Sequence, residues 1–270
     1  MQPPVVLSIA GSDSGGGAGI QADIRAMNAR KVFAATAITA VTAQNTTSVT
    51  GNELLSDSIV EAQIEAVLND LTPRAVKTGM LGQASTVRLV SRFAAEHRFP
   101  FLVVDPVLVT TTGFSLMDSN GAGIIREELL PYCDLITPNI EEAQALLSRE
   151  FEISSVADLV LIGNALLEYG PQAVLVKGGH AKQGFPTNSP DVLVTRDSTR
   201  VFDGPRVDSK NDHGTGCSLA SAIAAGVALG ESLEDSILAA KQLVTRAMQS
   251  SSSWKIGKGR GPLDMLGWNQ

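Results

Sequence analysis

The stretch DHGTGCSLASAIAAG, residues 212–226, holds the residue types best suited to chemistry. Gly214, Thr215 and Gly216 directly precede an apolar helical pattern, and the unpaired N–H groups at a helix start bind anions. Cys217 falls in the first helical turn, where the helix dipole lowers the pKa of a thiol. We therefore expect this loop to receive a transferring phosphoryl group while Cys217 takes a proton from a hydroxyl. The alternative is that the glycines only start a helix and that Cys217 is a small core residue.

Oxygen-bearing side chains suited to Mg²⁺ follow two other expected strands. In TPNIEEA, Asn139 ends a strand and Glu142 lies three residues further on, in the first turn of a helix. Completed by water and ATP phosphates, such oxygens are the ligands that Mg²⁺ takes, and Asp105 of VVDPV can join the same network. The spacing of Asn139 and Glu142 is equally that of a capping box, and the Asp-Pro pair equally suits a turn.

Two lysines are candidates for contact with phosphates. Lys177 leaves the apolar run VLVKGGH beside Gly178, and a lysine at a strand end either pairs with phosphate or extends to the surface. Lys241 lies in LAAKQLV, among apolar residues of a long helical stretch, where an ordinary surface lysine is the alternative.

The loop GSDSGGGAG, residues 11–19, stands between an apolar run and a helical stretch, as phosphate-binding loops do. Two of its glycines have Walker A spacing, but Gly17 and Ala18 stand where Lys and Ser/Thr should follow, so it is a poor nucleotide cradle. Its backbone can still approach a flat ligand closely. Gln44, at a strand end, offers the donor and acceptors that suit an aminopyrimidine or pyridine edge, or is simply a polar loop residue. Asp23, on the following helix, either points back at this ligand or caps the helix.

A parallel α/β sheet would position these residues. β-Branched runs alternate with amphipathic stretches, and the runs are continuously apolar, as in strands buried on both faces. The pattern predicts right-handed crossovers and a doubly wound, mostly parallel, three-layer α/β/α fold in one domain, 1–270. Ligands of such sheets bind beyond the carboxyl ends of the strands, so the polar residues there should converge on one cleft. The expected strands are 5–11, 34–41, 75–80, 101–107, 134–139 and 173–179, with a hairpin at 191–204; the expected helices are 20–30, 59–71, 85–97, 123–132, 140–148, 156–170, 214–230 and 232–251.

Composition argues against several other classes. The net charge is −7 and no basic run is present, which disfavours nucleic acid and anionic membranes as partners. We find no leader pattern and no segment apolar enough to span a bilayer. Cys133 and Cys217 cannot build a disulfide framework, and with His97, His180 and His213 they show no metal-site spacing. We expect a cytoplasmic protein whose partners are small molecules.

Taken together, the motifs resemble those of the hydroxymethylpyrimidine/phosphomethylpyrimidine kinases of thiamine biosynthesis, within the ribokinase-like superfamily. The resemblance is carried by AGSDSGGGAGIQAD, TAQNT, KTGML, VVDPV, ITPNIEEA, VLVKGGH, DHGTGCSLASAIAA and IGKGRGP, whose order and spacing cover nearly the whole chain. It implies transfer of the ATP γ-phosphoryl group to a hydroxymethylpyrimidine and then onto its monophosphate, with Mg²⁺, in a homodimer.

The resemblance also assigns roles to residues. It implies that the opening loop covers the pyrimidine, that Gln44 reads it, and that Cys217 stands where other ribokinase-like enzymes have a catalytic Asp. The expected residues are Gly214, Thr215, Gly216 and Cys217 for catalysis; Ala18, Gly19, Asp23, Gln44, Met80 and Val107 for the substrate; Asn139, Lys177, Gly178 and Lys241 for ATP; and Asp105, Asn139 and Glu142 for Mg²⁺.

One departure concerns the segment after DPV. The family commonly has Lys-Ser-Gly there, whereas this chain has TTTG at 110–113. The missing lysine predicts normal first-step activity and reduced second-step activity. Two alternatives stay open: a pyridoxal kinase, which would use the same phosphate apparatus on a pyridine ring, and a non-catalytic pyrimidine sensor.

Overall fold

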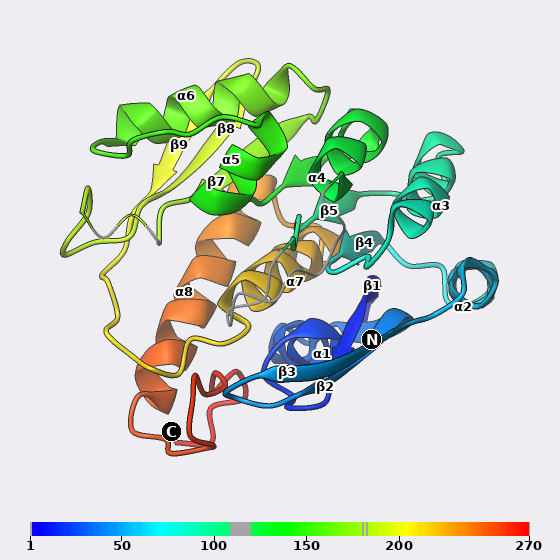
Figure 1. Ribbon diagram of the computed structural model, residues 1–270, viewed down its shortest axis with the longest axis horizontal. Coiled ribbons are helices and arrows are strands. Elements are labelled where there is room, and N and C mark those ends of the chain that lie inside the picture. The colour runs from blue at the N-terminus through cyan, green and yellow to red at the C-terminus, as the bar shows by residue number, and fades with distance from the viewer. Residues whose placement is uncertain (1, 109–119, 180, 182, 270) are drawn as a thin grey trace.

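The computed structural model describes residues 2–108, 120–179, 181 and 183–269. One nine-stranded sheet forms its centre (Figure 1), and the strands lie in the order β3-β2-β1-β4-β5-β6-β7-β8-β9. The parallel strands are β1 (Val5–Asp13), β2 (Phe33–Gln44), β4 (Ala75–Thr78), β5 (Leu102–Val104), β6 (Leu135–Ile136) and β7 (Ala173–Lys177). The antiparallel strands are β3 (Val49–Leu54), β8 (Asp191–Thr195) and β9 (Thr199–Phe202). The expected parallel sheet and hairpin are confirmed. Strand β3 was not expected, because VTGNEL is largely exposed at the sheet edge and has no apolar run.

Helices cover both faces of the sheet (Figure 1). Leu7 and Ile9 of β1 pack into the core on one face and Val6 into the core on the other, because successive side chains of a strand point to opposite faces. The expected three-layer α/β/α architecture is therefore confirmed. One face carries α2 (Asp57–Asp70), α3 (Ala84–Ala95), α4 (Gly121–Ile124), α5 (Ile140–Leu147) and α6 (Val156–Leu167); the other carries α1 (Gly19–Ala29), α7 (Thr215–Ala228) and α8 (Leu233–Ser251).

One expected helix, 123–132, is not continuous. Helix α4 passes into a single π turn, Ile125–Leu129, and then into a 3₁₀ turn, Leu130–Tyr132. Pro131 lies in that last turn and has no N–H to donate, so a regular α-helix cannot run through the segment.

Helix α7 is the element that matters most for the site. It is buried along most of its length and packs against β1, β4 and β5 as well as α1 and α8. Its small residues, mainly alanines, permit this close packing, and they leave its N-terminus at the edge of the sheet where the parallel strands end. Although α7 is apolar, neither it nor any other helix in the described part of the chain is long and apolar enough to cross a membrane.

Candidate active site

The carboxyl ends of the parallel strands bring the expected polar residues to one edge of the sheet. Asp13 and Gln44 end β1 and β2, Lys177 ends β7, and Asp105 follows β5 directly. Asn139, after β6, pairs with Lys177 through the backbone in an isolated parallel β-bridge. The chain leaves β1 first toward β2 and later returns to β4 on its other side, so the topological switch point lies at this edge. These residues lie at the same edge of the sheet, as expected, whereas His180 lies outside the described part of the chain.

Lys177, Asp105 and Glu142 form a charged cluster at the ends of β5, β6 and β7. The Lys177 ammonium lies 3.0 Å from Asp105 Oδ1 and 3.7 Å from Glu142 Oε2. Burial alone would lower the pKa of Lys177, but these two carboxylates outweigh it and raise the pKa, so the side chain is a cation. Burial raises the pKa of Glu142 to about 7, against the opposing effect of Lys177. The cluster therefore holds a fixed positive charge next to Glu142, a carboxylate that is costly to keep ionised.

The remaining oxygen of Asp105, Oδ2, is buried and has no hydrogen-bond partner among the described residues. A buried carboxylate oxygen is normally satisfied by a donor, an ordered water or a cation. Asn139 and Glu142 form a capping box at the start of α5, with the Asn139 N–H donating to Glu142 Oε2 at 2.7 Å. In the described residues no three His, Cys, Asp or Glu side chains are grouped to hold a metal. These oxygens therefore fit Mg²⁺ only if water and phosphates complete its coordination, as Mg²⁺ prefers.

The start of α7 lies between the opening loop and the charged cluster around Lys177. Gly214 has a φ of 82°, and a Cβ there would lie 2.0 Å from the carbonyl oxygen of Gly17 in the opening loop. A Cβ on Gly216 would lie 3.2 Å from the Lys177 ammonium. The positive end of the helix dipole and the lysine charge thus meet at one place, which suits a phosphoryl group.

Cys217 lies in the first turn of α7 as expected, but its pKa moves in the opposite direction from the one expected. Burial of the thiol raises the pKa to about 12, and the cation of Lys77 only partly opposes this rise. The carboxylates of Asp105 and Asp23 raise the pKa further, and the backbone of Gly19 lowers it. The sequence prediction of a lowered pKa is wrong because burial outweighs the helix dipole. Without ligands the thiol is protonated.

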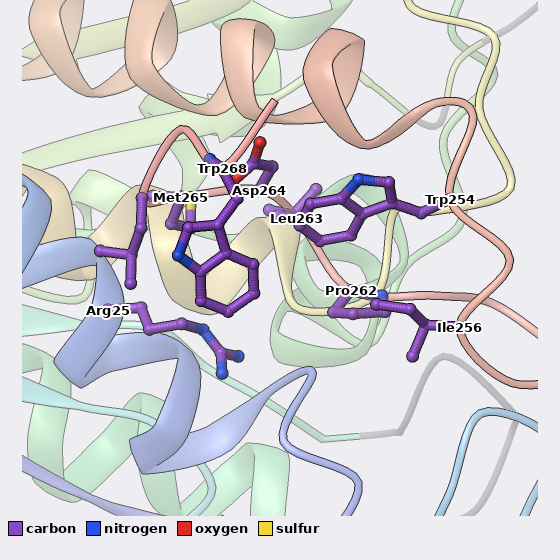
Figure 2. A pocket seen from close by; sticks show the side chains of 9 residues that line it. Arg25, Trp254, Ile256, Pro262, Leu263, Asp264, Met265 and Trp268 are labelled. Carbon is purple, nitrogen blue, oxygen red and sulfur yellow. The ribbon is translucent and has the colours of Figure 1, made fainter. Parts of the chain in front are cut away.

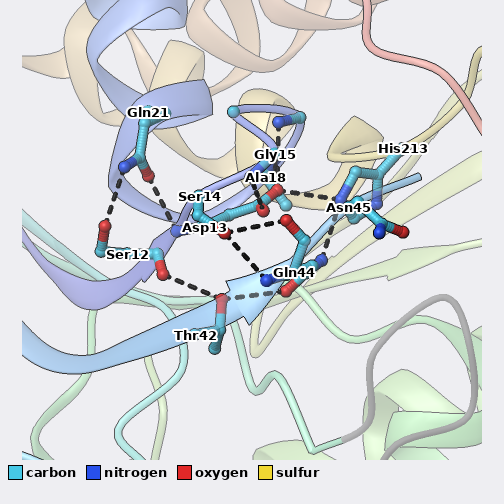
Figure 3. Close-up of polar contacts among 12 residues, drawn as sticks. Ser12, Asp13, Ser14, Gly15, Ala18, Gln21, Thr42, Gln44, Asn45 and His213 are labelled. Carbon is cyan, nitrogen blue, oxygen red and sulfur yellow. Dashed lines mark hydrogen bonds and ion pairs between the residues drawn. The ribbon is translucent and has the colours of Figure 1, made fainter. Parts of the chain in front are cut away.

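The opening loop is folded around its own carboxylate (Figure 3). Asp13 Oδ2 accepts hydrogen bonds from the N–H groups of Gly17 at 3.0 Å and Ala18 at 2.8 Å, and it lies 3.0 Å from His213 Nε2. Burial would raise the pKa of Asp13, but His213 and the backbone donors lower it overall. Backbone N–H groups already committed to an ionised carboxylate do not suit a phosphate, in agreement with the missing Lys-Ser/Thr pair.

His213 was given no direct chemical role from the sequence, yet it connects the segment before α7 to the opening loop and to Gln44. Its Nε2 lies 3.1 Å from the side-chain amide nitrogen of Gln44 and 3.0 Å from Asp13 Oδ2. Figure 3 draws both contacts. A Cβ on Gly17 would lie 2.2 Å from the His213 ring, so the ring packs directly on that glycine. The place of His213 immediately before Gly214 was the available signal. The contact fixes the Gln44 amide relative to the start of α7.

Asp23 is not placed to contact a substrate. Its side chain is fully buried, and its oxygens accept hydrogen bonds from Ser8 at 2.6 Å, Ser221 at 2.7 Å and Lys77 at 2.9 Å. The expectation of substrate contact is corrected for this reason: protein donors already occupy both oxygens, and neither is exposed. Lys77, which is fully buried as well, was expected from the sequence only as one of the polar residues at strand ends, because its carboxylate partner on α1 could not be recognised from the sequence.

Lys241 is buried rather than on the surface, so the alternative of a surface lysine is wrong. Its ammonium lies 2.6 Å from Asp191 Oδ2 and donates to the Ser189 carbonyl at 2.7 Å. Asp191 Oδ1 in turn accepts a hydrogen bond from the N–H of Gly178 at 3.1 Å. Because its ammonium is committed to these groups, the expectation of direct ATP contact is corrected: Lys241 supports the loop after Lys177 through Asp191.

The two apolar residues expected to line a substrate pocket lie together near the opening loop. Met80 and Val107 pack with Ala40 in a small cluster that is separate from the two main cores. A Cβ on Gly11 would lie 3.0 Å from the Met80 sulfur, so this cluster adjoins the opening loop. Gly19 begins α1. The segment 110–113 lies outside the described residues.

The motif IGKGRGP, residues 256–262, contacts both the segment before His213 and the loop after Gln44. Arg260 Nε donates to Asp212 Oδ1 at 2.6 Å, and the Arg260 N–H donates to the Thr46 carbonyl at 3.0 Å. The segment therefore links the residues before His213 to the loop after Gln44. A small cavity nearby is walled by Arg25, Trp254 and Trp268, among others (Figure 2), but none of the expected site residues lines it.

The proteins of known sequence to which this chain is similar include kinases. Residues 13–264 match the family model described as phosphomethylpyrimidine kinase. The hydroxymethylpyrimidine/phosphomethylpyrimidine kinase of Rhizobium meliloti is 42% identical, over 96% of this chain and 96% of its own length. A thiamine biosynthetic bifunctional enzyme of Arabidopsis thaliana is 44% identical over 97% of this chain, which spans only 50% of that larger protein.

Solved structures of two kinase types share the fold. A pyridoxal kinase of Bacillus subtilis in an ADP complex superposes with a TM-score of 0.88 and 29% identity, covering 98% of each chain. A phosphomethylpyrimidine kinase of Clostridium difficile has a TM-score of 0.78 and 36% identity, covering 90% of this chain and 99% of its own. Fold similarity thus extends to both types, whereas identity is higher with the pyrimidine kinase.

Proposed function

Because the chain belongs to the phosphomethylpyrimidine kinase family and is a kinase, we propose that it phosphorylates 4-amino-5-hydroxymethyl-2-methylpyrimidine with ATP, and then phosphorylates the monophosphate to the diphosphate, in thiamine biosynthesis. The observation that carries the proposal is the position of the start of α7. Gly214 packs against the opening loop on one side and Gly216 lies beside Lys177 on the other. An acceptor held by the opening loop and a phosphate held by Lys177 would meet there.

The phosphate side supplies positive charge. Lys177 provides a fixed cation, and the N–H groups at the start of α7 provide donors for the charge that develops on the transferring group. Such stabilisation is usually the largest single contribution to phosphoryl transfer. Asp105, Asn139 and Glu142 would hold Mg²⁺ through water and the ATP phosphates, and the ion would neutralise phosphate charge there.

The substrate side supplies orientation. In the proposal, Gln44 reads the ring edge, the backbone of Ala18 and Gly19 covers the ring, and Met80 and Val107 form its apolar lining. Support comes from the contact of Gln44 with His213 and from the small apolar cluster beside the loop.

Cys217 is the proposed base. Cys217 lies in the first turn of α7, whose start at Gly214 packs against Gly17 of the opening loop. As a thiolate, Cys217 would take the proton of the hydroxymethyl group while the oxygen attacks the γ-phosphorus.

The main alternative is a pyridoxal kinase. The close superposition on the Bacillus subtilis pyridoxal kinase favours it, since the same scaffold holds a pyridine substrate in that protein. The higher identity with pyrimidine kinases and the paired donor and acceptors of Gln44 favour the pyrimidine. The retained Lys177 and Glu142 argue against a non-catalytic sensor.

A Mg·ATP assay on three acceptors tests the proposal: hydroxymethylpyrimidine, its monophosphate and pyridoxal. We expect product from the pyrimidine, loss of product in Cys217→Ala and full activity in Cys133→Ala, since Cys133 is buried in the core away from the site. Turnover of pyridoxal alone would establish the alternative. Pyrimidine binding without turnover would indicate a sensor.

The second phosphorylation is the weaker step in this proposal. The sequence TTTG at 110–113 lacks the lysine that the family commonly has there. A smaller cationic field should weaken binding of the phosphorylated intermediate more than binding of the neutral one. Equal kcat/KM values for the pyrimidine and its monophosphate would contradict this part.

We also propose that the chain acts as one kinase domain, as a homodimer, in the cytoplasm. Support for an assembly surface comes from large apolar side chains exposed on the edge hairpin of β2 and β3, namely Phe33, Val41 and Leu54. Sedimentation analysis at micromolar concentration would give twice the 28.3 kDa monomer mass if the homodimer forms.

A further inference from the structure

A fully buried ion pair lies in the layer beneath Cys217. The side chains of Lys77 and Asp23 are both 0% exposed, and the lysine Nζ is 2.9 and 3.1 Å from the two carboxylate oxygens. Apolar residues of similar volume are often as stable as such a pair, or more so, because two charges must be desolvated. Stability alone therefore does not account for a charged pair at this place.

The pair sits one helical turn below the thiol. Gly19 and Asp23 are four residues apart on α1, and Cys217 and Ser221 are four apart on α7, so each set shares one helix face. Helices α1 and α7, which carry these residues, pack against each other. In the next layer the Ser221 hydroxyl donates to Asp23 Oδ1 at 2.7 Å. Asp23 therefore contacts the face of α7 that carries Cys217, at the residue one helical turn further along, Ser221.

Lys77 enters this layer from β4 with its charge directed toward the site. Asp23 also accepts a hydrogen bond from Ser8 of β1, so its carboxylate is saturated by Ser8, Ser221 and Lys77. Within the described residues, the Lys77 ammonium donates hydrogen bonds to Asp23 alone. A Cβ on Gly79 would lie 2.9 Å from this ammonium, at the end of the strand. The cation is therefore fixed in place but has capacity for a second anion.

Four charged groups act on Cys217 from the elements packed around it. They are Lys77 of β4, Asp23 of α1, Asp105 after β5 and Lys177 of β7. Lys177 is already shared between Asp105 and Glu142, and ATP phosphates would engage it further. Lys77 is the cation that remains for the sulfur.

We propose that Lys77, held in place by Asp23, is a positioning residue for Cys217. Its ammonium supplies the positive charge that stabilises the thiolate form of the Cys217 sulfur. The inference rests on the proposed function, in which Cys217 is the base. The thiol first loses its proton to solvent. In the transfer step the substrate O–H bond breaks and an S–H bond forms, while the substrate oxygen bonds to the γ-phosphorus and the bond from that phosphorus to the ADP oxygen breaks.

The test is the pH dependence of Cys217 alkylation, without nucleotide or metal. The chain has two cysteines, so a Cys133→Ala background leaves Cys217 as the single thiol. We expect Lys77→Met to slow iodoacetamide alkylation at pH 8.5 by about tenfold, and Asp23→Asn to accelerate it by about tenfold, because one pKa unit changes the thiolate fraction tenfold. Opposite signs from the two members of one pair indicate an electrostatic role. Changes of the same sign, or no change, would overturn the proposal.

Two further variants separate charge from structure. Ser221→Ala removes a hydrogen bond of Asp23 but no charge, so its alkylation profile should stay within about twofold of the background, well below the tenfold shift of one pKa unit. Lys77→Arg keeps the charge and should restore most of the rate lost in Lys77→Met. If Lys77→Met does not fold, Asp23→Asn decides: unchanged or slower alkylation overturns the proposal. Alkylation needs neither ATP nor pyrimidine, so its result stands apart from the kinase assay, and an inactive kinase with both expected shifts would reject the proposed function alone.

Discussion

Lys77 and Lys177 occupy similar places in the sequence but different places in the protein. Each lies in or at the end of a parallel strand shortly before a glycine, in AVKTG and LVKGG. We name Lys77–Asp23 the sealed pair, because both side chains are 0% exposed and the carboxylate is saturated. We name Lys177–Asp105 the open pair, because the lysine is 12% exposed and Asp105 Oδ2 has no hydrogen-bond partner among the described residues.

The difference comes from the element that supplies the carboxylate. Helix α1 carries Asp23 into the layer between the sheet and α7, where hydroxyl groups from two further elements complete its hydrogen bonds. Asp105 comes from the loop after β5, at the edge of the sheet, where part of its capacity is unused. The degree of hydrogen-bond satisfaction thus separates a pair that fixes structure and charge from a pair that can take a ligand.

The largest effect is expected from breaking the sealed pair. Lys77→Met should lower the free energy of unfolding by about 3–5 kcal/mol, because it leaves the Asp23 charge buried and uncompensated. Urea denaturation measures this. Lys177→Met, the matched control in the open pair, should lose less, since its partners lie at the edge of the sheet. Equal losses in the two variants would remove the distinction between the pairs.

The open pair should instead respond to Mg²⁺. Asp105→Asn keeps the size of the side chain but removes the charge that Lys177 and the cation share. We expect the Mg²⁺ concentration for half-maximal rate to rise about tenfold, as for groups that support metal ligands. A titration of rate against Mg²⁺ at saturating ATP measures the shift. An unchanged requirement would mean that Asp105 serves only Lys177.

Asp13 extends the comparison to a carboxylate held without a lysine. Its pKa is lowered in the folded protein despite burial, chiefly by His213 and by backbone donors. A lowered folded pKa means that the unfolded state binds more protons, so this stability is present above the ordinary aspartate pKa of 3.8 and is lost as the pH falls through the folded pKa. Asp13→Asn should cost about 1–3 kcal/mol at pH 7 and much less at pH 3, measured by denaturation at both values. A cost that does not change with pH would contradict the assignment.

The smallest effect is expected at the exposed ion pair of Arg260 and Asp212. Their side chains are 42% and 26% exposed, and such pairs contribute about 0.2–1 kcal/mol. Arg260→Ala should therefore raise KM for the pyrimidine less than about fivefold and leave KM for ATP unchanged, in steady-state assays varying each substrate. A larger rise would show that the 256–262 segment controls the Gln44 loop more strongly than its contacts indicate.

The sequence predicted the parts of the fold that depend on regular patterns. Continuous apolar runs identified the parallel strands, and helical periodicity identified most of the helices. It missed β3, because an exposed edge strand containing Gly51 and Asn52 carries no apolar run. It also gave 123–132 as one helix, although Pro131 prevents a regular one. Both errors occur where local composition does not decide the backbone.

For the site, sequence patterns identified the groups at strand ends but not what each would pair with. Asn139, Lys177 and Asp105 meet as the parallel topology requires. Lys77 was expected only as one polar residue at a strand end and His213 was given no direct chemical role, because their partners come from segments far away in the sequence. The pKa of Cys217 was given the wrong direction, because the helix dipole can be recognised from sequence whereas the burial of one thiol cannot.

The most direct test of the account is the kcat/KM of Lys177→Met for hydroxymethylpyrimidine with Mg·ATP, measured at matched folded concentration. We propose that Lys177 of the open pair binds the transferring phosphate. We therefore predict that kcat/KM falls by about 10²–10³-fold while the far-UV spectrum stays that of the wild type. A value within about tenfold of the wild type would contradict it, because removal of one such donor normally costs far more.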